Sequence, residues 1–508
     1  MVVMDRLTDK PDWQRKIFDD SIVEKWKREA INLPLQPFWE ELAEQAPDNW
    51  RADFAAPRPE RMFTEEMFDY CVMELRDKAR YAESSGVGVV RTLEGYARAA
   101  KSDTVVGAEL RKDLIDAFDT LTEHQADTPD WHPGSDEMVR NLVHPSMYPL
   151  VWGRSHIIRE PVVGVEDAVD PKWLGKGQPY EADMTRRKGN GLYEYKGHDG
   201  CWSKTYQWLP SNVAFRDDGG VRFTSYINNL HPTRYPEIYR TLEKLVECAL
   251  PIWDQCLFRY WTHGVCRTAD PEFNQFDDYD KESENFADDR LFQLFRKAKH
   301  PQPLPYKPRD YNIEEKDTLR GQFRDSGLQI IVKMASIELT PEKPTYPGGN
   351  WHLEGQLNEH IVGTALYYLD ADNVTPSRLS FRKATDGDSP DLRDAVGQDS
   401  FSWAEEVYAM FLRDGFPVQS HGSVVTAPGR LLAFPNVLQH RVEPFGLEDE
   451  TRPGRRRFVA LWLVDPHFEI VSTANVAPQQ GAIMAERSIS HEKMERELMQ
   501  QGYCFCEH

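Results

Sequence analysis

Residues 350–355 read Asn350-Trp351-His352-Leu353-Glu354-Gly355, follow Pro347-Gly348-Gly349, and decide the fold that we expect for this chain. Side chains alternate along a strand, so an extended stretch would point His352 and Glu354 to the same face. Two such ligands and one distant histidine make the facial triad that binds Fe(II) outside haem. We expect His440, which follows Phe434-Pro435-Asn436, to be the distant partner.

Composition alone predicts about two His-x-acid pairs in a chain of this kind, and the sequence has two. The pair at His352 follows a glycine-rich turn and precedes Ile361–Leu369, which is rich in strand-forming residues. The other pair, His467 and Glu469, follows Asp465-Pro466 and has no later histidine in a comparable setting. Context therefore favours the first pair as the metal ligands.

Two further histidines compete for a ligand role. His360 lies at the entry of an apolar segment, where it could be a core residue or a neighbour of the site. His421, in Gln419-Ser420-His421-Gly422, is typical of a turn. Both lack the Pro-Asn turn that precedes His440.

Short apolar segments separated by glycine and proline turns fill the region from about residue 319 and predict a β-sandwich or barrel. The expected strands are Leu328–Leu339, Ile361–Leu369, Arg378–Arg382, Ser423–Thr426, Leu431–Phe434 and Arg456–Val464.

The rest of the chain is expected to be mostly helix and loop. Helical spacing of apolar residues predicts amphipathic helices over Glu65–Ala82 and Val105–His124, and another over Glu237–Cys248 that Pro251 would end. We therefore divide the chain into a helical region (1–145), a mixed region that packs on the core (146–318), a β-rich catalytic core (319–475) and a C-terminal helix (476–508).

Composition limits the partners. The net charge of −22 disfavours binding to nucleic acid or to an anionic membrane surface, because phosphates require basic surface. No stretch is long and apolar enough to span a membrane. Seven cysteines, an odd number, are most simply reduced thiols. We expect a cytoplasmic protein that acts on a small molecule; its oligomeric state is not readable.

Two neutral imidazoles and one carboxylate leave a bound ferrous ion with one positive charge, which favours an anionic, chelating 2-oxo acid. The far carboxylate of that acid needs a cation, and an arginine fork binds carboxylates well. Arg455-Arg456-Arg457 opens the apolar segment 458–464 and follows His440 in the chain. Both faces of this strand are apolar, so alternation does not settle which arginine faces inward; we favour Arg456, with Arg457 as the rival.

Two other arginines flank Leu379-Ser380-Phe381. Arg378 and Arg382 could bind an acidic substrate, or could pair with local acids such as Asp370 and Asp372. Both interpretations stay open.

The order of His352, Glu354, His440 and Arg456 on short strands resembles the Fe(II)/2-oxoglutarate-dependent oxygenases. More narrowly, residues from about 140 onward resemble a mostly fungal family known as domain of unknown function 4246 (DUF4246). The matching stretches are Val139–Ser146, Ser225–Pro232, Trp351–Gly355 and Phe434–Asn436. Glu354 departs from the aspartate that is more usual in the superfamily.

The superfamily resemblance implies an α+β fold in which a helical N-terminal region wraps a double-stranded β-helix, or jelly roll. It also implies an Fe(II)/2-oxoglutarate-dependent dioxygenase, with His352, Glu354 and His440 as catalytic metal ligands and Arg456 or Arg457 on 2-oxoglutarate. Such an enzyme uses O₂ to hydroxylate, desaturate or cyclise a small organic substrate and releases succinate and CO₂. The alternatives are an Fe(II) oxidase or dioxygenase that does not use 2-oxoglutarate, and a metal-free β-sandwich that binds a ligand or partner.

Overall fold

The structure is a computed structural model. It describes residues 1–33, 63–173, 175–180, 202–257, 267, 303–385, 410–411 and 418–480. The predicted C-terminal helix (476–508) lies outside these ranges beyond residue 480, and its described residues, 476–480, are not helical.

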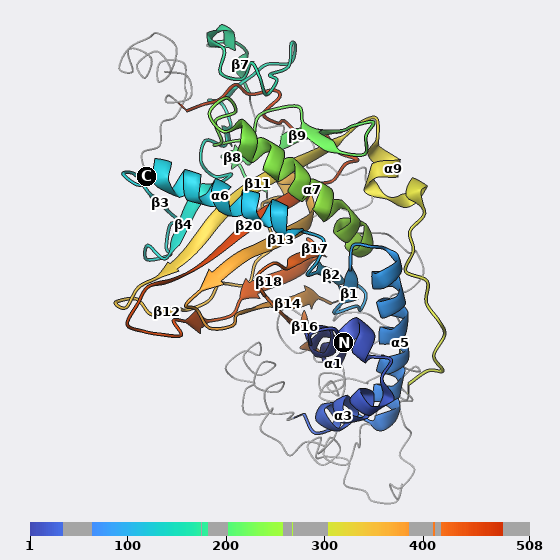
Figure 1. The fold of residues 1–508 in the computed structure, drawn as a ribbon. Helices are drawn as coiled ribbons and strands as arrows, with labels where there is room; N and C mark the ends of the chain where they lie inside the picture. The colour runs from blue at the N-terminus through green and yellow to red at the C-terminus, as the bar shows by residue number, and fades with distance from the viewer. Residues whose placement is uncertain are drawn as a thin grey trace, which may run out of the picture.

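A ten-stranded antiparallel sheet forms the centre of the molecule (Figure 1). Its main path runs β1-β2-β17-β13-β20-β11-β4-β3, and β9, paired with β10, joins the free end of β11. The strands are β1 Val90–Thr92, β2 Ala99–Ser102, β3 Asp130–Trp131, β4 Val139–Val143, β9 Ser211–Phe215, β10 Val221–Phe223, β11 Leu328–Leu339, β13 Ile361–Asp372, β17 Leu431–Pro435 and β20 Gly454–Val464.

A second, four-stranded antiparallel sheet has the order β15-β16-β14-β18. Its strands are β14 Arg378–Ala384, β15 Met410–Phe411, β16 Val418–Val425 and β18 Leu438–Val442. Three two-stranded ribbons complete the described strands: β5 Leu150–Val151 with β8 Tyr206–Gln207, β6 His156–Ile157 with β7 Gln178–Pro179, and β12 Thr345–Tyr346 with β19 Phe445–Gly446.

Both faces of the large sheet are buried, and strand alternation divides its apolar side chains between two cores. On β20, Val459, Leu461 and Leu463 pack in a core with helices α6 (Ala108–His124) and α7 (Pro236–Leu257). Ala460 and Trp462, on the other face of β20, pack with residues of the four-stranded sheet such as Leu379 and Phe381. The space between the two sheets is therefore a separate core from the one beneath the helices.

Helices α6 and α7 lie across one face of the large sheet, and the N-terminal helices gather beside the four-stranded sheet (Figure 1). The N-terminal helices are α1 Val2–Thr8, α2 Trp13–Lys16, α3 Asp20–Ile31 and α5 Glu65–Ser84, and a short α9, Leu319–Phe323, precedes β11. The predicted end of α7 at Pro251 is wrong. The helix continues to Leu257 because Ile252, Trp253 and Cys256 are all buried against the sheet.

Residues 1–145 contribute strands as well as helices. β1, β2, β3 and β4 all pair within the large sheet, β2 against β17 and β4 against β11. The N-terminal region is thus continuous with the sheet that carries the C-terminal strands. Within the described ranges, no helix is long and apolar enough to cross a membrane.

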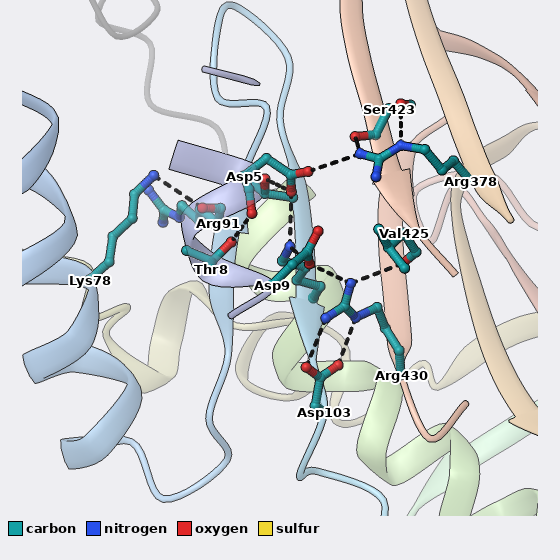
Figure 2. Close-up of polar contacts among 12 residues, drawn as sticks. Asp5, Thr8, Asp9, Lys78, Arg91, Asp103, Arg378, Ser423, Val425 and Arg430 are labelled. Atoms are coloured by element: carbon teal, nitrogen blue, oxygen red, sulfur yellow. Dashed lines mark hydrogen bonds and ion pairs between the residues drawn. The ribbon is translucent and has the colours of Figure 1, made fainter. Parts of the chain in front are cut away.

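Buried ion pairs fasten the N-terminal helix to the strands, as Figure 2 shows. Arg430, beside β17, donates to both carboxylate oxygens of Asp103 at 2.7 and 2.8 Å and to Asp9 at 2.7 Å. Asp5, in α1, accepts from Lys101 at 2.9 Å and lies 3.7 Å from Arg378 of β14. The contacts of Arg430 and Arg378 join segments more than 300 residues apart in the chain.

We predict that Arg430→Met lowers the free energy of unfolding by about 1.5–3 kcal/mol, because it removes the charge-assisted hydrogen bonds that the buried guanidinium donates to Asp103 and Asp9. Urea denaturation measures this change. The control is Arg452→Met, because Arg452 is half exposed and its acidic partners lie 3.6 and 3.7 Å away; we expect a loss below about 1 kcal/mol. Equal losses in both variants would contradict the conclusion that the ion pairs of Arg430 stabilise the fold more than an exposed ion pair does.

Candidate metal centre

The residues around His352 and His440 are joined through their backbones. The amide of His352 donates to the carbonyl of His440 at 3.2 Å, and the amide of His440 donates back at 3.0 Å. His440 lies on β18, whose other edge pairs with β14, where Phe381 is the Cα partner of His440. The 352 stretch is thus fixed beside the four-stranded sheet, next to a residue 88 positions away in the chain.

The three predicted ligands meet at one point. The Nε2 atom of His440 lies 3.1 Å from Oε1 of Glu354, and Nε2 of His352 lies 4.0 Å from the same oxygen. One ligand atom from each residue lies within 4.8 Å of the others. The side chain of His440 is 4% exposed and that of Glu354 12%, whereas that of His352 is 47% exposed. The group is therefore buried on one side and open on the other.

Each imidazole presents Nε2 to the centre. Nδ1 of His352 lies 2.7 Å from the carbonyl oxygen of Asn350, which can only accept, so Nδ1 carries the proton and Nε2 keeps its lone pair. The ring of His440 packs against Phe434 and Phe381, with centroids 4.8 and 6.3 Å away. These contacts hold both rings in the orientation that a metal ligand needs.

Asn436, in the Pro-Asn turn before β18, fixes the backbone of the carboxylate ligand. Its Oδ1 accepts from the amide of Glu354 at 2.9 Å, and its Nδ2 donates to the carbonyl of Glu354 at 3.0 Å and to that of Ile361 at 3.1 Å. The sequence predicted that this turn positions His440, whereas its amide side chain holds Glu354.

The electrostatics of the group favour metal-binding protonation states. Burial raises the pKa of Glu354, but the hydrogen bond and charge of His440, with smaller contributions from His352 and Lys333, outweigh it and leave the pKa lowered. Burial, followed by the proximity of His440, lowers the pKa of His352. At neutral pH the carboxylate is charged and His352 is neutral.

Arg456 and Arg457 lie on opposite faces of β20. Arg457 points toward the helices, where its Nε lies 3.0 Å from Asp370 and its Nη1 lies 2.5 Å from Asp119 of α6. Its guanidinium is thus neutralised by two carboxylates.

Arg456 faces the space between the sheets, on the same side of β20 as Trp462. It is 3% exposed, donates to the hydroxyl of Ser377 and lies over the rings of Tyr368 and Phe445, 4.9 and 5.3 Å from their centroids. Its Nε has no hydrogen-bond partner, and no carboxylate lies within ion-pair distance among the residues that the structure describes. Burial lowers the pKa of this guanidinium.

Arg378 and Arg382 are not brought to the triad. They alternate on β14 with Leu379 and Phe381, which pack between the sheets, so both arginines lie on the outer face. Arg378 donates to Ser423 at 2.7 Å, and Arg382 donates to Gln439 at 2.7 Å and lies over the ring of Trp351. Asp370 and Asp372 were the acids expected to pair with Arg378. The carboxylate that lies near Arg378 is instead that of Asp5, at 3.7 Å.

The two competing histidines also lie elsewhere. His360 stacks on Phe468 with ring centroids 5.3 Å apart, and its backbone adopts a positive φ of 48°. His421 is buried on β16, and burial lowers its pKa to about 4. Neither belongs to the cluster of three side chains that could hold a metal ion.

We predict that Asn436→Ala weakens metal binding by about 10–100-fold, because the backbone of Glu354 loses its anchor. Titration of Mn(II), followed by electron paramagnetic resonance, measures this change. Asn373→Ala is the matched control: the side chain of Asn373 also bonds the backbone, donating to three carbonyls of the 449–453 turn. Equal weakening in both variants would count against a specific role for Asn436.

Comparisons with known proteins find several solved structures to which this chain is weakly similar. A structure entitled Fe(II)/(alpha)ketoglutarate-dependent dioxygenase TqaL, labelled with selenomethionine, is 8% identical, with 72% of this chain and 95% of that chain covered and a TM-score of 0.23. IDO from Bacillus thuringiensis is 12% identical, with 28% and 51% covered and a TM-score of 0.18. AviO1 from Streptomyces viridochromogenes Tue57 is 15% identical, with 28% and 54% covered and a TM-score of 0.15.

The match spans about half the length of IDO and AviO1, and likenesses this weak carry no argument about function. No curated protein matches this chain. The model of a family described as "Protein of unknown function (DUF4246)" matches residues 65–487, and the model of its N-terminal domain matches residues 1–29. The chain therefore belongs to the DUF4246 family.

Proposed function

We propose that this protein is a non-haem Fe(II)/2-oxoglutarate-dependent oxygenase that oxidises a small organic substrate. The observation that carries the proposal is the meeting of His352, Glu354 and His440, with all three ligand atoms within 4.8 Å of one another. Two imidazoles and one carboxylate are the donor set of a facial Fe(II) site.

The geometry fits such an ion. Ligand atoms about 2.1 Å from a metal, the length typical of metal–imidazole bonds, lie about 3 Å apart when their bonds meet at right angles. The separation of His440 Nε2 and Glu354 Oε1, 3.1 Å, agrees with this value, and His352 needs only a small inward movement from 4.0 Å. The exposure of His352 leaves that side of the site accessible to small molecules.

Strand order supports a double-stranded β-helix. β17-β13-β20-β11 face a second sheet of β16-β14-β18, and the bridge between His352 and His440 adds the 352 stretch to the edge of that second sheet. Two antiparallel sheets of four strands are the architecture of a jelly roll. We propose that these eight segments are the catalytic core.

Arg456 is the proposed partner of 2-oxoglutarate. A buried guanidinium without a carboxylate partner in the described structure is costly unless an anion satisfies it. The rings of Tyr368 and Phe445 exclude water from it, and the hydroxyl of Ser377 fixes its position. Arg457 is already paired with Asp370 and Asp119, so we propose Arg456 rather than Arg457 for this role.

When bound, the ferrous ion and 2-oxoglutarate supply the redox chemistry: O₂ is reduced, the 2-oxo acid loses CO₂ to give succinate, and one oxygen atom is available to oxidise the substrate. The chain itself supplies the position of each participant. His352 and His440 would each offer Nε2, Glu354 would offer the charge, and the rings of Phe381 and Phe434 cover that side of the centre beside His440.

We expect the wild-type protein to bind one Fe(II) per chain under anaerobic conditions, and His352→Ala and His440→Ala to lose nearly all of it, since each removes one of three protein ligands. Metal analysis after gel filtration measures this. His467→Ala is the control, because His467 belongs to the other His-x-acid pair and is exposed beside Asp465. Equal, negligible iron in all four proteins would favour a metal-free binding protein.

We expect 2-oxoglutarate to produce a visible charge-transfer band with the anaerobic Fe(II) protein, and Arg456→Met to raise its Kd at least about 30-fold, as for other buried charge pairs that lose one partner. Absorption titration measures both effects. Arg457→Met should destabilise the fold and leave this Kd unchanged. Bound iron without any 2-oxoglutarate band would favour the oxidase that uses no 2-oxo acid.

A further inference from the structure

Lys333 lies in the middle of β11 and is unusual there. Ten of the twelve residues of this strand are buried, and the two that are not are Lys333 and Glu338. β20 pairs with β11 at Lys333, whereas on the other side β9 pairs with residues 328–330 and β4 with residues 334–337, so Lys333 lies between these two pairings and keeps part of its side chain exposed. A charged side chain at such a place needs an explanation.

The side chain of Lys333 is directed between the two sheets. Ile330, Val332 and Met334 pack on the helical side, and Ile331 packs on the other side, so alternation places Lys333 with Ile331. Ala460 is its Cα partner on β20. Lys333 therefore shares a face with Trp462 and Arg456.

The charge of Lys333 acts directly on the candidate metal centre. Its proximity lowers the pKa of both His352 and Glu354, and in turn Glu354 is the charge that most opposes the lowering of the pKa of Lys333 by burial. Within the described ranges, no carboxylate lies within ion-pair distance of Lys333. Glu354 therefore is not its ion-pair partner and remains available to a metal.

Neutral polar and aromatic side chains surround Lys333 on this face. Met334 pairs with Val143, so His144 follows β4 beside Lys333. The ring of His144 is 5.3 Å from that of His132 and 6.4 Å from that of Trp208, and Trp208 lies 5.3 Å from Trp462. These five residues, Lys333, His132, His144, Trp208 and Trp462, are called the lysine pocket below.

A bound anion favours the protonated form of Lys333, so the occupied lysine pocket carries one positive charge. Burial, followed by the charge of Lys333, lowers the pKa of His132 and lowers that of His144 to about 2, so both rings are neutral at pH 7. Nδ1 of His144 accepts from the amide of Ser146 at 3.1 Å, which leaves its proton on Nε2 as a donor. One ammonium and a neutral donor match a singly charged carboxylate better than a phosphate, which carries nearly two charges.

The lysine pocket is separate from Arg456. Arg456 pairs with Ile337, four residues along β11 from Lys333, and this spacing corresponds to roughly 13 Å. A single small dicarboxylate that extends from the metal centre to Arg456 does not account for a second unpaired cation in another row of the sheet.

We propose that the lysine pocket binds the substrate through a carboxylate, with Lys333 as the charged anchor and the Trp208–Trp462 pair as a flat apolar wall for the adjoining carbon skeleton. The inference rests on the proposed function for the identity of this ligand as the substrate. The recognition itself needs neither iron nor 2-oxoglutarate.

The test compares acids with their amides on the full-length protein. The probes are benzoate, phenylacetate and 3-phenylpropionate, each paired with its primary amide, and ligand-observed NMR titration without metal measures their Kd values. We expect at least one acid to bind wild type about tenfold or more tightly than its amide, the value of a hydrogen bond to a charged group. Lys333→Met should abolish this preference, and Lys333→Arg should retain most of it.

Arg456→Met is the matched control, because it removes the other unpaired cation and should leave the preference intact. Circular dichroism and a thermal melt establish that each variant is folded. The proposal is overturned if no wild-type acid–amide pair shows a preference, if Lys333→Met keeps it, or if Arg456→Met alone removes it.

A metal arm separates this proposal from the proposed function. Mn(II) and 2-oxoglutarate are titrated against the same variants. If the protein binds neither Mn(II) nor 2-oxoglutarate but shows an acid preference that depends on Lys333, the carboxylate site is supported and the proposed oxygenase function is contradicted. If Lys333→Met weakens Mn(II) or 2-oxoglutarate binding and leaves acid preference unchanged, Lys333 serves the metal or co-substrate and the substrate role is refuted.

Discussion

Two backbone hydrogen bonds between His352 and His440 are the constraint on which the candidate site depends. They place a short irregular stretch beside β18 and thereby bring two imidazoles together across 88 positions of sequence. Asn436 positions Glu354, the third residue of the site. The side chain of Asn436 accepts a hydrogen bond from the backbone amide of Glu354 and donates one to its backbone carbonyl. The side chains are thus positioned mainly by backbone contacts, which are less adaptable than contacts between flexible side chains.

The large sheet determines which of the two arginines of β20 faces the candidate site. Because both of its faces are buried, the apolar pattern of β20 is continuous, and sequence alone could not tell whether Arg456 or Arg457 faces inward. The structure separates them by partner: Arg457 meets Asp370 and Asp119 on the helical side, and Arg456 meets only a hydroxyl and aromatic rings among the described residues. Pairing between α6 and the sheet, invisible in a local pattern, makes that difference.

Sequence reasoning predicted the grouping of His352, Glu354 and His440 because strand alternation and a Pro-Asn turn are local signals. It located β11, β13 and β20 for the same reason. It missed the end of α7, where burial of Trp253 and Cys256 outweighs the local effect of Pro251. It also missed the ion pairs that Asp5 and Asp9 make with Arg378 and Arg430, since no local pattern links residues so distant. Lys333 was visible as a lone charge inside an apolar segment, but the signal has no meaning until the facing sheet is known.

The positions of Arg456 and Lys333 connect the overall charge of the chain to its chemistry. In a protein with a net charge of −22, cations find acidic partners easily, as Arg430 and Arg457 do. A cation that stays unpaired while it is wholly or partly buried is therefore informative, because folding has not supplied the obvious counter-ion. Arg456 and Lys333 share the face between the sheets but stand in different rows, one among aromatic rings and one within electrostatic reach of Glu354. Under the two proposals above, this arrangement would let two anions enter the same space independently, as an oxidation that combines a co-substrate and a substrate at one metal requires.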